Sequence, residues 1–314
     1  MLAAGVSRGA SASVLVVRHL RKSFGKVPAL RDVSFSVAEG EVFGFLGPNG
    51  AGKSTTIKII LGLLRADAGT VSLSGFDVRK QHLEAARLLG SATEVPGYYG
   101  YLTGRQNLRQ FARTLGKPSE NQLQELLDLV GLHDRGDDKV KRYSLGMRQR
   151  LSIAQALLGS PRVLVLDEPT NGLDPAGMYE LRRLLRHLAK VVGMTVFFSS
   201  HLLAEVEEIC DRVAVISRGE VRAVGPLSQL LATGSNSYEL RVSDAAQAAS
   251  MLQRLDGARV EMGPRHGTLR VEAGSDIGPL MLRALLDADI RVDGYSRGER
   301  RLEDLFLELT GASA

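Results

Sequence analysis

Apolar positions along the chain predict strands that alternate with helices. Residues 14–20 and 33–40 are rich in β-branched side chains and follow the two-residue period of a half-buried strand. Residues 163–166 are wholly apolar, which is typical of a strand buried in a parallel sheet. Residues 178–190 have apolar side chains at helical spacing. Because this alternation continues along most of the chain, the sequence predicts an α/β fold built on a parallel sheet.

A break near residues 225–237 divides the chain into two expected domains. This stretch ends in Gly, Ser and Asn, which is the composition of a linker. Residues 14–230 are expected to form the larger domain, and residues 239–311 a small α+β unit without a phosphate loop or a cluster of metal ligands. Residues 1–13 lack the apolar centre of a signal peptide and are expected to be a disordered lead.

The composition narrows the class of protein. With 44% hydrophobic and 24% charged residues, the 314-residue chain has a normal globular profile. Its formal net charge of +5 comes from dispersed Lys and Arg side chains, so we expect a solvated surface and no nucleic-acid face. The single cysteine, Cys210, excludes an internal disulfide, fits a reducing compartment and is expected to lie in the core. No run of ~20 apolar residues predicts a membrane span.

Residues 47–54 read GPNGAGKS and match the phosphate-binding pattern G-x-x-x-x-G-K-[ST] between a predicted strand and a predicted helix. Glycines allow backbone N–H groups to curl around phosphates, and the helix that follows directs its positive end at them. We expect Lys53 to reach the terminal phosphates and the Ser54 hydroxyl to ligate Mg²⁺. The residues expected to contact the nucleotide here are Gly47, Pro48, Asn49, Gly50, Ala51, Gly52, Lys53, Ser54 and Thr55.

Acidic residues and a histidine follow two predicted strands. Asp167 and Glu168 end the apolar strand, and beside a phosphate loop Asp167 is expected to hold Mg²⁺ and Glu168 to polarise an attacking water. His201 follows the predicted strand TVFFSS, at the sheet edge where ligand sites of α/β folds gather. His201 is therefore expected to touch the terminal phosphate. For each residue, a purely structural role is the alternative.

A second stretch, YSLGMRQR at residues 143–150, also offers a seat for an anion. Ser144 and Gly146 stand at the start of a predicted helix, where backbone N–H groups are free. The alternative for Ser144 is an ordinary helix cap. If both seats serve the same nucleotide, that nucleotide is sandwiched between two copies of the chain.

These motifs, in this order, make residues 14–225 resemble the nucleotide-binding subunit of ABC transporters. GPNGAGKS resembles the Walker A loop, VLVLDE the Walker B strand, and YSLGM takes the place of the LSGGQ signature. Asn171-Gly172-Leu173-Asp174 resembles the D-loop, His201 the switch histidine, and Phe24 the aromatic residue that stacks on adenine.

The resemblance implies a P-loop NTPase cassette with a RecA-like core and a helical subdomain at about residues 95–160. It implies ATP hydrolysis with Mg²⁺, and a homodimer in which the signature of each subunit closes on ATP held by the other. It also implies a separate polytopic membrane permease as partner, so that the chain would lie at the cytoplasmic face of the membrane, as a peripheral subunit.

Two departures from the family pattern indicate to which group of ABC subunits the chain is most similar. The signature has Leu145 and Met147 where Gly and Gln are frequent, and Glu94 stands where Gln is usual and is expected to ligate Mg²⁺ or to hold water. With the terminal LEDLFLEL, these features resemble the exporters of antibiotic resistance and self-protection, of the bacitracin and daunorubicin types. Tyr98 and Tyr99 are expected either to anchor the permease or to pack on their own subdomain. Export of lipid, polysaccharide or another cargo, and a soluble ATPase acting on ribosomes or DNA, remain the alternatives.

Overall fold

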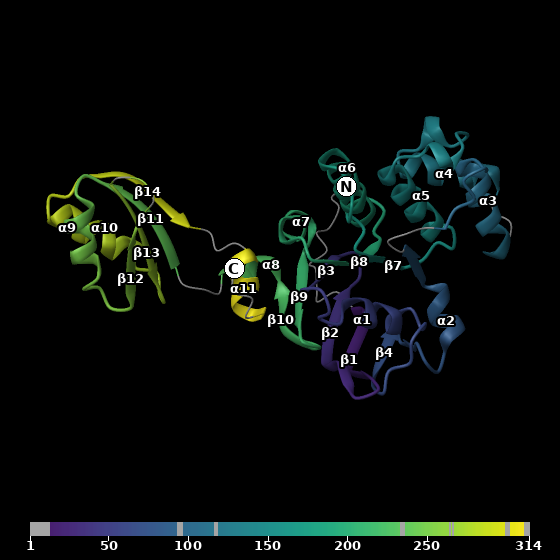
Figure 1. Cartoon of the computed structure of the whole chain (residues 1–314), viewed down its shortest axis with the longest axis horizontal. Coiled ribbons are helices and arrows are strands. Elements are labelled where there is room, and N and C mark those ends of the chain that lie inside the picture. Colours follow the sequence, from purple (N-terminus) through teal and green to yellow (C-terminus); the bar gives the residue numbers. More distant parts are fainter. Residues whose placement is uncertain are drawn as a thin grey trace, which may run out of the picture. The chain divides into compact units, whose positions relative to one another are not determined.

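The computed structural model describes residues 13–92, 97–115, 119–232, 236–263, 265, 267–298 and 302–310. The chain divides into two compact units, Met1–Pro226 and Leu227–Ala314 (Figure 1). Each unit has a hydrophobic core of its own. Among the described helices, none combines the length and the apolar character needed to cross a membrane.

In the described residues, ten strands of the first unit form one sheet in the order β5-β4-β1-β2-β10-β9-β3-β8-β7-β6. Parallel pairing joins β6, β7, β8, β3 and β9, whereas β1, β2, β4 and β5 pair in antiparallel fashion. The strands are β1 (Ser13–Phe24), β2 (Val27–Ala38), β3 (Val42–Leu46), β4 (Ala68–Leu73), β5 (Phe76–Asp77), β6 (Leu89–Ala92), β7 (Val163–Asp167), β8 (Thr195–Ser200), β9 (Arg212–Ser217) and β10 (Glu220–Pro226). The predicted α/β fold with a parallel sheet is confirmed.

Burial explains why the central strands are so apolar. Every residue of β3 and β8 is buried, because helices cover the parallel part of the sheet. The rings of Phe35, Phe43 and Phe197 stack in this core, with centroids 5.4–5.9 Å apart. Parallel pairing brings the carboxyl ends of β3, β7 and β8 to one edge of the sheet, where the loops that follow them meet.

The helices of the first unit fall into two groups (Figure 1). Those that accompany the sheet are α1 (Lys53–Ile60), α2 (His82–Arg87), α6 (Pro175–Lys190) and α7 (Leu203–Ile209). A separate helical cluster contains α3 (Gly104–Leu115), α4 (Glu120–Leu129), α5 (Leu145–Leu157) and the 3₁₀ turns η1 (His133–Arg135) and η2 (Val140–Arg142). This cluster falls within the stretch expected to be the helical subdomain.

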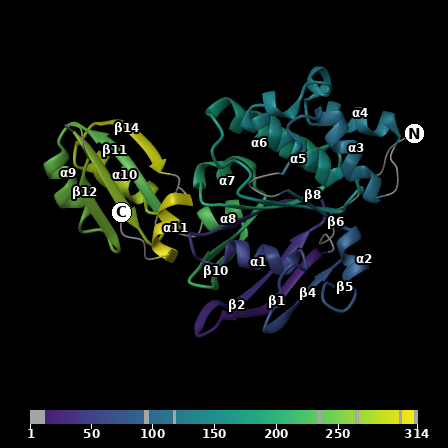
Figure 2. The same cartoon turned by 45° about the vertical axis from the view of Figure 1, so that its right-hand side comes forward.

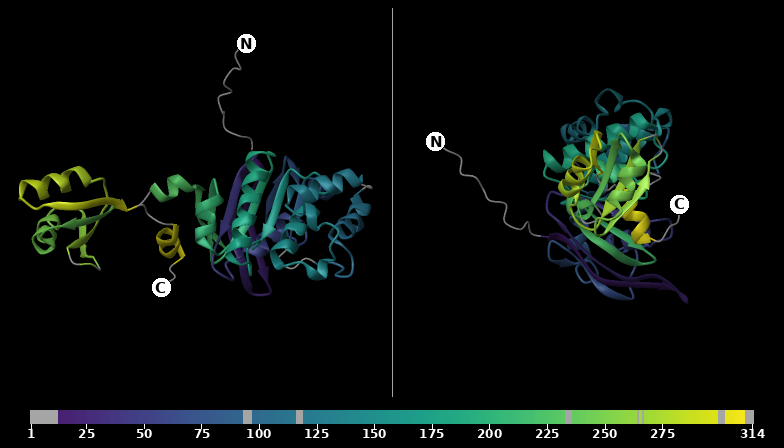
Figure 3. Two further views of the ribbon diagram at one scale, coloured as in Figure 1. Left: turned by 90° about the horizontal axis from the view of Figure 1, so that it is seen from above. Right: turned by 90° about the vertical axis from the view of Figure 1, so that its left-hand side faces the viewer.

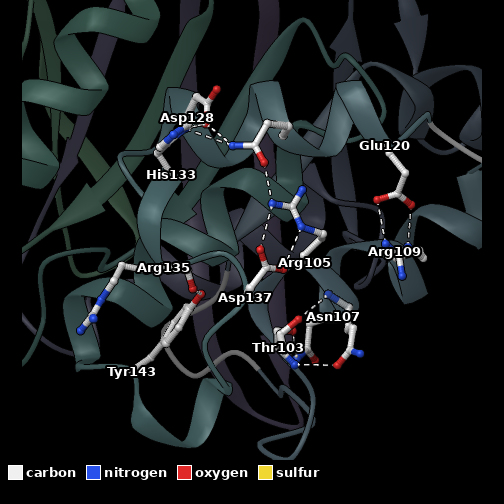
Figure 4. Close-up of polar contacts among 12 residues, drawn as sticks. Thr103, Arg105, Asn107, Arg109, Glu120, Asp128, His133, Arg135, Asp137 and Tyr143 are labelled. Carbon is white, nitrogen blue, oxygen red and sulfur yellow. Dashed lines mark hydrogen bonds and ion pairs between the residues drawn. The ribbon is translucent and has the colours of Figure 1, made fainter.

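Polar contacts join the members of the helical cluster (Figure 4). Arg105 on α3 donates from Nε to Asp137 at 3.0 Å and from Nη2 to Gln124 on α4 at 2.5 Å. Arg109 binds Glu120 through two hydrogen bonds of 2.7 Å, and this pairing lowers the pKa of the Glu120 carboxyl. The planar guanidinium suits such two-point contacts, so these arginines fix α3 against α4 and the turns beside it.

The second unit is a four-stranded antiparallel sheet in the order β12-β13-β11-β14 (Figure 3). Its elements are α8 (Leu227–Ala232), β11 (Asn236–Val242), α9 (Ala245–Leu252), β12 (Ala258–Met262), β13 (Thr268–Ala273), α10 (Gly278–Asp287), β14 (Val292–Gly298) and α11 (Leu302–Thr310). From β11 to β14 the order is the βαββαβ pattern of ferredoxin-like units. Inward residues alternate along β11 and β13 and pack with α9 and α10 into one core.

Candidate nucleotide site

The loop between β3 and α1 has space only for glycine at two positions. A Cβ at Gly47 would lie 2.5 Å from the carbonyl oxygen of Ile216, and a Cβ at Gly52 would lie 2.6 Å from Leu30 Cδ2. Gly52 also has φ 113°, and Gly50 has φ 78°, which are conformations that glycine adopts without steric cost. The glycines that predict a phosphate loop are therefore required by its backbone path as well.

Lys53 opens α1, and its side chain turns back across the loop. It is 6% exposed, and its Nζ donates to the carbonyl oxygen of Gly47 at 2.7 Å. The same ammonium forms an ion pair with Glu168 Oε1 at 3.1 Å. A buried ammonium held at the mouth of a glycine loop is placed to bind a phosphate group.

The loops after β7 and β8 bring Glu168 and His201 together. Glu168 Oε2 lies 2.7 Å from His201 Nδ1, so one carboxylate links the histidine to Lys53. Glu168 has φ 47°, which is uncommon for a residue with a side chain and is often found at functional sites. Three residues far apart in the sequence thus converge on one point.

Asp167 is held by a residue that the sequence analysis did not identify. Ser199 Oγ donates to Asp167 Oδ1 at 2.7 Å and accepts from the backbone N–H of Glu168 at 3.0 Å. Ser199 therefore fixes both acidic residues at the end of β7. Ser199 stands two residues before His201 in the predicted strand TVFFSS, which is a signal too weak to have singled it out.

Lys53, Glu168 and His201 belong to the lining of a pocket of about 490 Å³. It is lined by Ala29, Pro48, Asn49, Gly50, Gly52, Lys53, Ser54, Thr55, Glu168, Asn171 and His201. Nine of these were predicted to contact the nucleotide or to act on it, while Ala29 and Asn171 were not. The pocket is polar, as expected for a phosphate-bearing ligand.

The oxygen donors near the pocket fit Mg²⁺. Ser54 has an exposed hydroxyl in the first turn of α1, and Asp167 ends β7 with a carboxylate. Mg²⁺ takes one or two such oxygen ligands and completes its shell with water and phosphate. The described residues contain no group of three His, Cys, Asp or Glu side chains that could hold a metal ion by themselves. Glu94 lies outside the described residues.

Ser144 caps α5 within its own chain. Its hydroxyl accepts from the backbone N–H of Met147 at 3.2 Å, which is the alternative that the sequence left open. The preceding Tyr143 anchors this position, because its buried hydroxyl donates to the carbonyl oxygen of Arg135 at 2.6 Å and burial raises its pKa to about 12. Ser144 and Gly146 do not line the nucleotide pocket. Within one chain, therefore, the phosphate loop and the anion site at the start of α5 do not form one pocket.

Comparisons with known proteins agree with this geometry. Residues 30–171 match the family model of the ABC transporter. The uncharacterised ABC transporter ATP-binding protein YhcH of Bacillus subtilis is 40% identical over 95% of this chain and 96% of its own length. The chain belongs to the ATP-binding subunits of ABC transporters. The predicted family and its activity, ATP hydrolysis in a transporter, are confirmed.

Two further similarities refine the family assignment. The bacitracin transport ATP-binding protein BcrA of Bacillus licheniformis is 36% identical over 95% of this chain and 98% of its own length. The ADP conformation of MJ1267, an ATP-binding cassette of an ABC transporter, matches with a TM-score of 0.64 and 27% identity over 70% of this chain and 93% of its own. The predicted cassette fold is confirmed, and the chain binds ATP.

Asp174 and Phe24, two further predicted contacts, lie outside the pocket lining, as do Gly47 and Ala51 of the phosphate loop. Asp174 caps α6, since its Oδ1 accepts from the backbone N–H of Gly177 at 3.1 Å. Phe24 ends β1 with 54% of its surface exposed, and the ammonium of Lys22 lies 5.7 Å from the centre of its ring. An exposed ring at a strand end is free to stack on a planar base.

The tyrosines expected at the permease contact differ in exposure. Tyr98 is half-buried with its ring edge-on to Phe111, and burial raises the pKa of its phenol. Tyr99 is 51% exposed beside the exposed Tyr101. The buried Asn107 fixes this segment, because its Oδ1 accepts from the Tyr99 N–H and its Nδ2 donates to the Tyr99 carbonyl oxygen.

Glu205 is a buried acid of the cassette that the sequence analysis did not identify. It is 4% exposed, and its Oε2 accepts from Thr170 Oγ1 at 2.6 Å and from Ser200 Oγ at 3.4 Å. Its Oε1 has no hydrogen-bond partner among the described residues. Burial raises the pKa of this carboxyl. Glu205 therefore joins the loop that follows Glu168 to the strand end that precedes His201.

Replacing Glu205 by Gln is expected to raise the free energy of unfolding by about 1 kcal/mol at pH 8 and to leave it nearly unchanged at pH 4. Because burial raises the folded-state pKa, Glu205 stabilises the fold below its unfolded-state pKa and loses this effect as the pH rises through the folded-state value. An amide has no such loss. Urea unfolding at both pH values measures the difference.

The control is Glu208→Gln, which changes an exposed acid paired with Arg182. Its effect at pH 8 is expected to be zero or a small loss of stability. A loss of stability in Glu205→Gln at pH 8 would show that the buried carboxylate is stabilising and would refute the expectation.

Proposed function

We propose that this chain is the ATPase of an exporter that removes an antibiotic or a similar toxic compound through a separate membrane permease. The observation that carries the ATPase role is the polar pocket in which Lys53, Glu168 and His201 converge. The cargo class is supported by the similarity to BcrA, whose name describes bacitracin transport.

In the proposed reaction, the phosphate loop and Lys53 bind the ATP phosphates. Glu168 releases Lys53 to the phosphate and orients the attacking water, whose proton its carboxylate accepts. His201 holds Glu168 in place and contacts the terminal phosphate. Mg²⁺, bound by Ser54 and Asp167 and in the proposal also by Glu94, would neutralise charge on the phosphates.

The second anion seat is proposed to act on ATP bound to another copy of the chain. Gly146 leaves the start of α5 open, since a Cβ there would meet no atom closer than 3.9 Å. Ser144 keeps a hydroxyl at the same helix start, and the helix dipole favours an anion there. Two identical chains would thus enclose two ATP molecules, with Asp174 of each D-loop beside the contact and Phe24 on the adenine.

The permease is proposed to bind near Tyr99 and Tyr101. Both residues are more than half exposed, their ring centroids lie 5.9 Å apart, and Asn107 on α3 binds the backbone of Tyr99. Aromatic residues on a fixed backbone are frequent anchors of protein interfaces. The chain would then lie at the cytoplasmic face of the membrane as a peripheral subunit.

The test is a pull-down of the tagged chain from detergent-solubilised membranes of its native cells in the presence of ATP. The expected result is one polytopic membrane protein in fixed ratio to the chain. Deletion of that partner is expected to sensitise cells to one class of antibiotic. A partner that exports lipid or polysaccharide would contradict the proposed cargo class. Recovery of ribosomes or soluble proteins alone would contradict the proposed pairing with a permease.

A further inference from the structure

Strand β8 places one buried serine directly opposite the acidic end of β7. β8 lies between β3 and β7 in the sheet, and helix α6 lies beside it (Figure 2). In the parallel register of β7 and β8, Ser199 is the partner of Asp167. Ser199 is wholly buried, so bulk water does not compete for its hydroxyl. Whatever the hydroxyl binds is therefore held by the protein alone.

The Ser199 hydroxyl makes two hydrogen bonds, one as donor and one as acceptor. It donates to Asp167 Oδ1 at 2.7 Å and accepts from the backbone N–H of Glu168 at 3.0 Å. A hydroxyl has one proton to donate and lone pairs that accept, so a single serine satisfies both neighbours. Among the described residues, no other side chain binds the Asp167 carboxylate. The orientation of that carboxylate therefore depends on Ser199.

The bond to the Glu168 N–H supports an uncommon backbone conformation. Glu168 has φ 47°, which persists in a residue with a side chain only where surrounding contacts hold it. In this conformation the Glu168 carboxylate reaches both Lys53, at 3.1 Å, and His201, at 2.7 Å. Ser199 thus stabilises the backbone turn that directs Glu168 into the nucleotide pocket.

We propose that Ser199 is a positioning residue for ATP hydrolysis, acting through Asp167 on the affinity for Mg²⁺ and through Glu168 on turnover. The inference rests on the proposed roles of these two acids. A metal-binding carboxylate that is already oriented by a hydrogen bond loses less freedom when it binds the ion. Removal of such a supporting contact typically lowers metal affinity or activity by about 10- to 100-fold.

Thr195 provides a matched control at the other end of the same strand. It begins β8, is wholly buried, and its Oγ1 accepts from the backbone N–H of Gly40 at 2.9 Å. It does not line the nucleotide pocket. Thr195→Val removes this buried hydrogen bond and keeps the shape of the side chain. The control therefore separates a general loss of stability from a loss of positioning.

The first measurement is the binding of Mn²⁺, used as a probe for Mg²⁺, to the full-length chain with a non-hydrolysable ATP analogue. Electron paramagnetic resonance reports the bound Mn²⁺. Ser199→Ala is expected to weaken Mn²⁺ binding about 10- to 30-fold. Ser199→Cys, which keeps a weaker donor in the same place, is expected to lie between the two. Binding of the analogue in EDTA is expected to be unchanged, because the phosphate loop is intact, and this shows that each variant is folded.

The second measurement is steady-state ATP hydrolysis at saturating Mg²⁺. Ser199→Ala is expected to lower kcat about 30-fold with little change in KM for ATP, because Glu168 loses its orientation while Lys53 and the loop remain. Thr195→Val is expected to keep both constants and the Mn²⁺ affinity.

Each measurement can contradict one part of the proposal. An unchanged Mn²⁺ affinity in Ser199→Ala would overturn the link to Asp167, and an unchanged kcat would overturn the link to Glu168. An equal loss in Thr195→Val would show that Ser199 is merely structural. Failure of the proposed function has a different signature, because the unmodified chain would then hydrolyse no ATP, or Glu168→Gln would hydrolyse it at the normal rate.

Discussion

Replacing Glu168 by Gln is expected to lower the rate of ATP turnover by about 10²- to 10⁴-fold while ATP binding persists. The amide has the shape of the carboxylate but cannot accept a proton from water. Glu168 forms an ion pair with Lys53 at 3.1 Å. Loss of the carboxylate charge therefore frees the Lys53 ammonium for the phosphate and does not weaken ATP binding. The variant is therefore expected to accumulate as an ATP-bound dimer.

Single-turnover hydrolysis and equilibrium ATP binding separate these two effects. Glu208→Gln makes the same chemical change on the exposed surface and is expected to keep the rate of the unmodified chain. Hydrolysis that continues at the normal rate in Glu168→Gln would remove Glu168 from the role of base. Loss of ATP affinity would instead show that the carboxylate contributes to the binding pocket.

The second large effect is expected from Ser144→Arg, which should abolish the ATP-dependent dimer and leave ATP binding to the monomer intact. An Arg side chain at the start of α5 would occupy the space proposed for the partner's phosphate. A steric cost of about 3 kcal/mol weakens such an association more than a hundredfold. Analytical ultracentrifugation with and without ATP, in the Glu168→Gln background, measures the dimer.

Ser144 also caps α5, so the substitution removes a local hydrogen bond as well. Ser119→Arg is the matched control, because Ser119 caps α4 in the same helical cluster and accepts from Gln122. Each substitution is expected to cost about 1 kcal/mol of stability through the lost cap, while only Ser144→Arg affects the dimer. An ATP-dependent dimer of normal affinity in Ser144→Arg would refute the proposed sandwich.

The parts of the site that sequence reasoning found are those with local chemistry. The phosphate loop is a continuous stretch in which glycine spacing, Lys53 and the following helix all belong to one pattern. Asp167 and Glu168 were found because an apolar strand ended in acids after such a loop. The alternation of strands and helices was enough to predict the parallel sheet. Each element is visible in the sequence because burial of one face sets the spacing of its apolar residues.

The parts that were missed depend on tertiary contacts. Ser199 binds Asp167 and Glu205 binds Thr170, each across more than 30 positions, and an isolated Ser or Glu has no local signature. The sequence could not distinguish Tyr98 from Tyr99, because the exposure of each ring depends on Phe111 and Asn107 of α3. For Ser144 the sequence left two roles open, and the structure shows the helix cap.

The side chain of Leu145 lies against the D-loop of its own chain, since a Cβ at Gly172 would be 3.1 Å from Leu145 Cδ2. The backbone N–H of Asn171, in turn, donates to the carbonyl oxygen of Glu168. A substitution that displaces the start of α5 would therefore displace the D-loop as well, and the reverse also holds. In the proposed sandwich of two chains around two ATP molecules, one altered chain would disturb both nucleotides of a mixed pair, and such alleles would be genetically dominant.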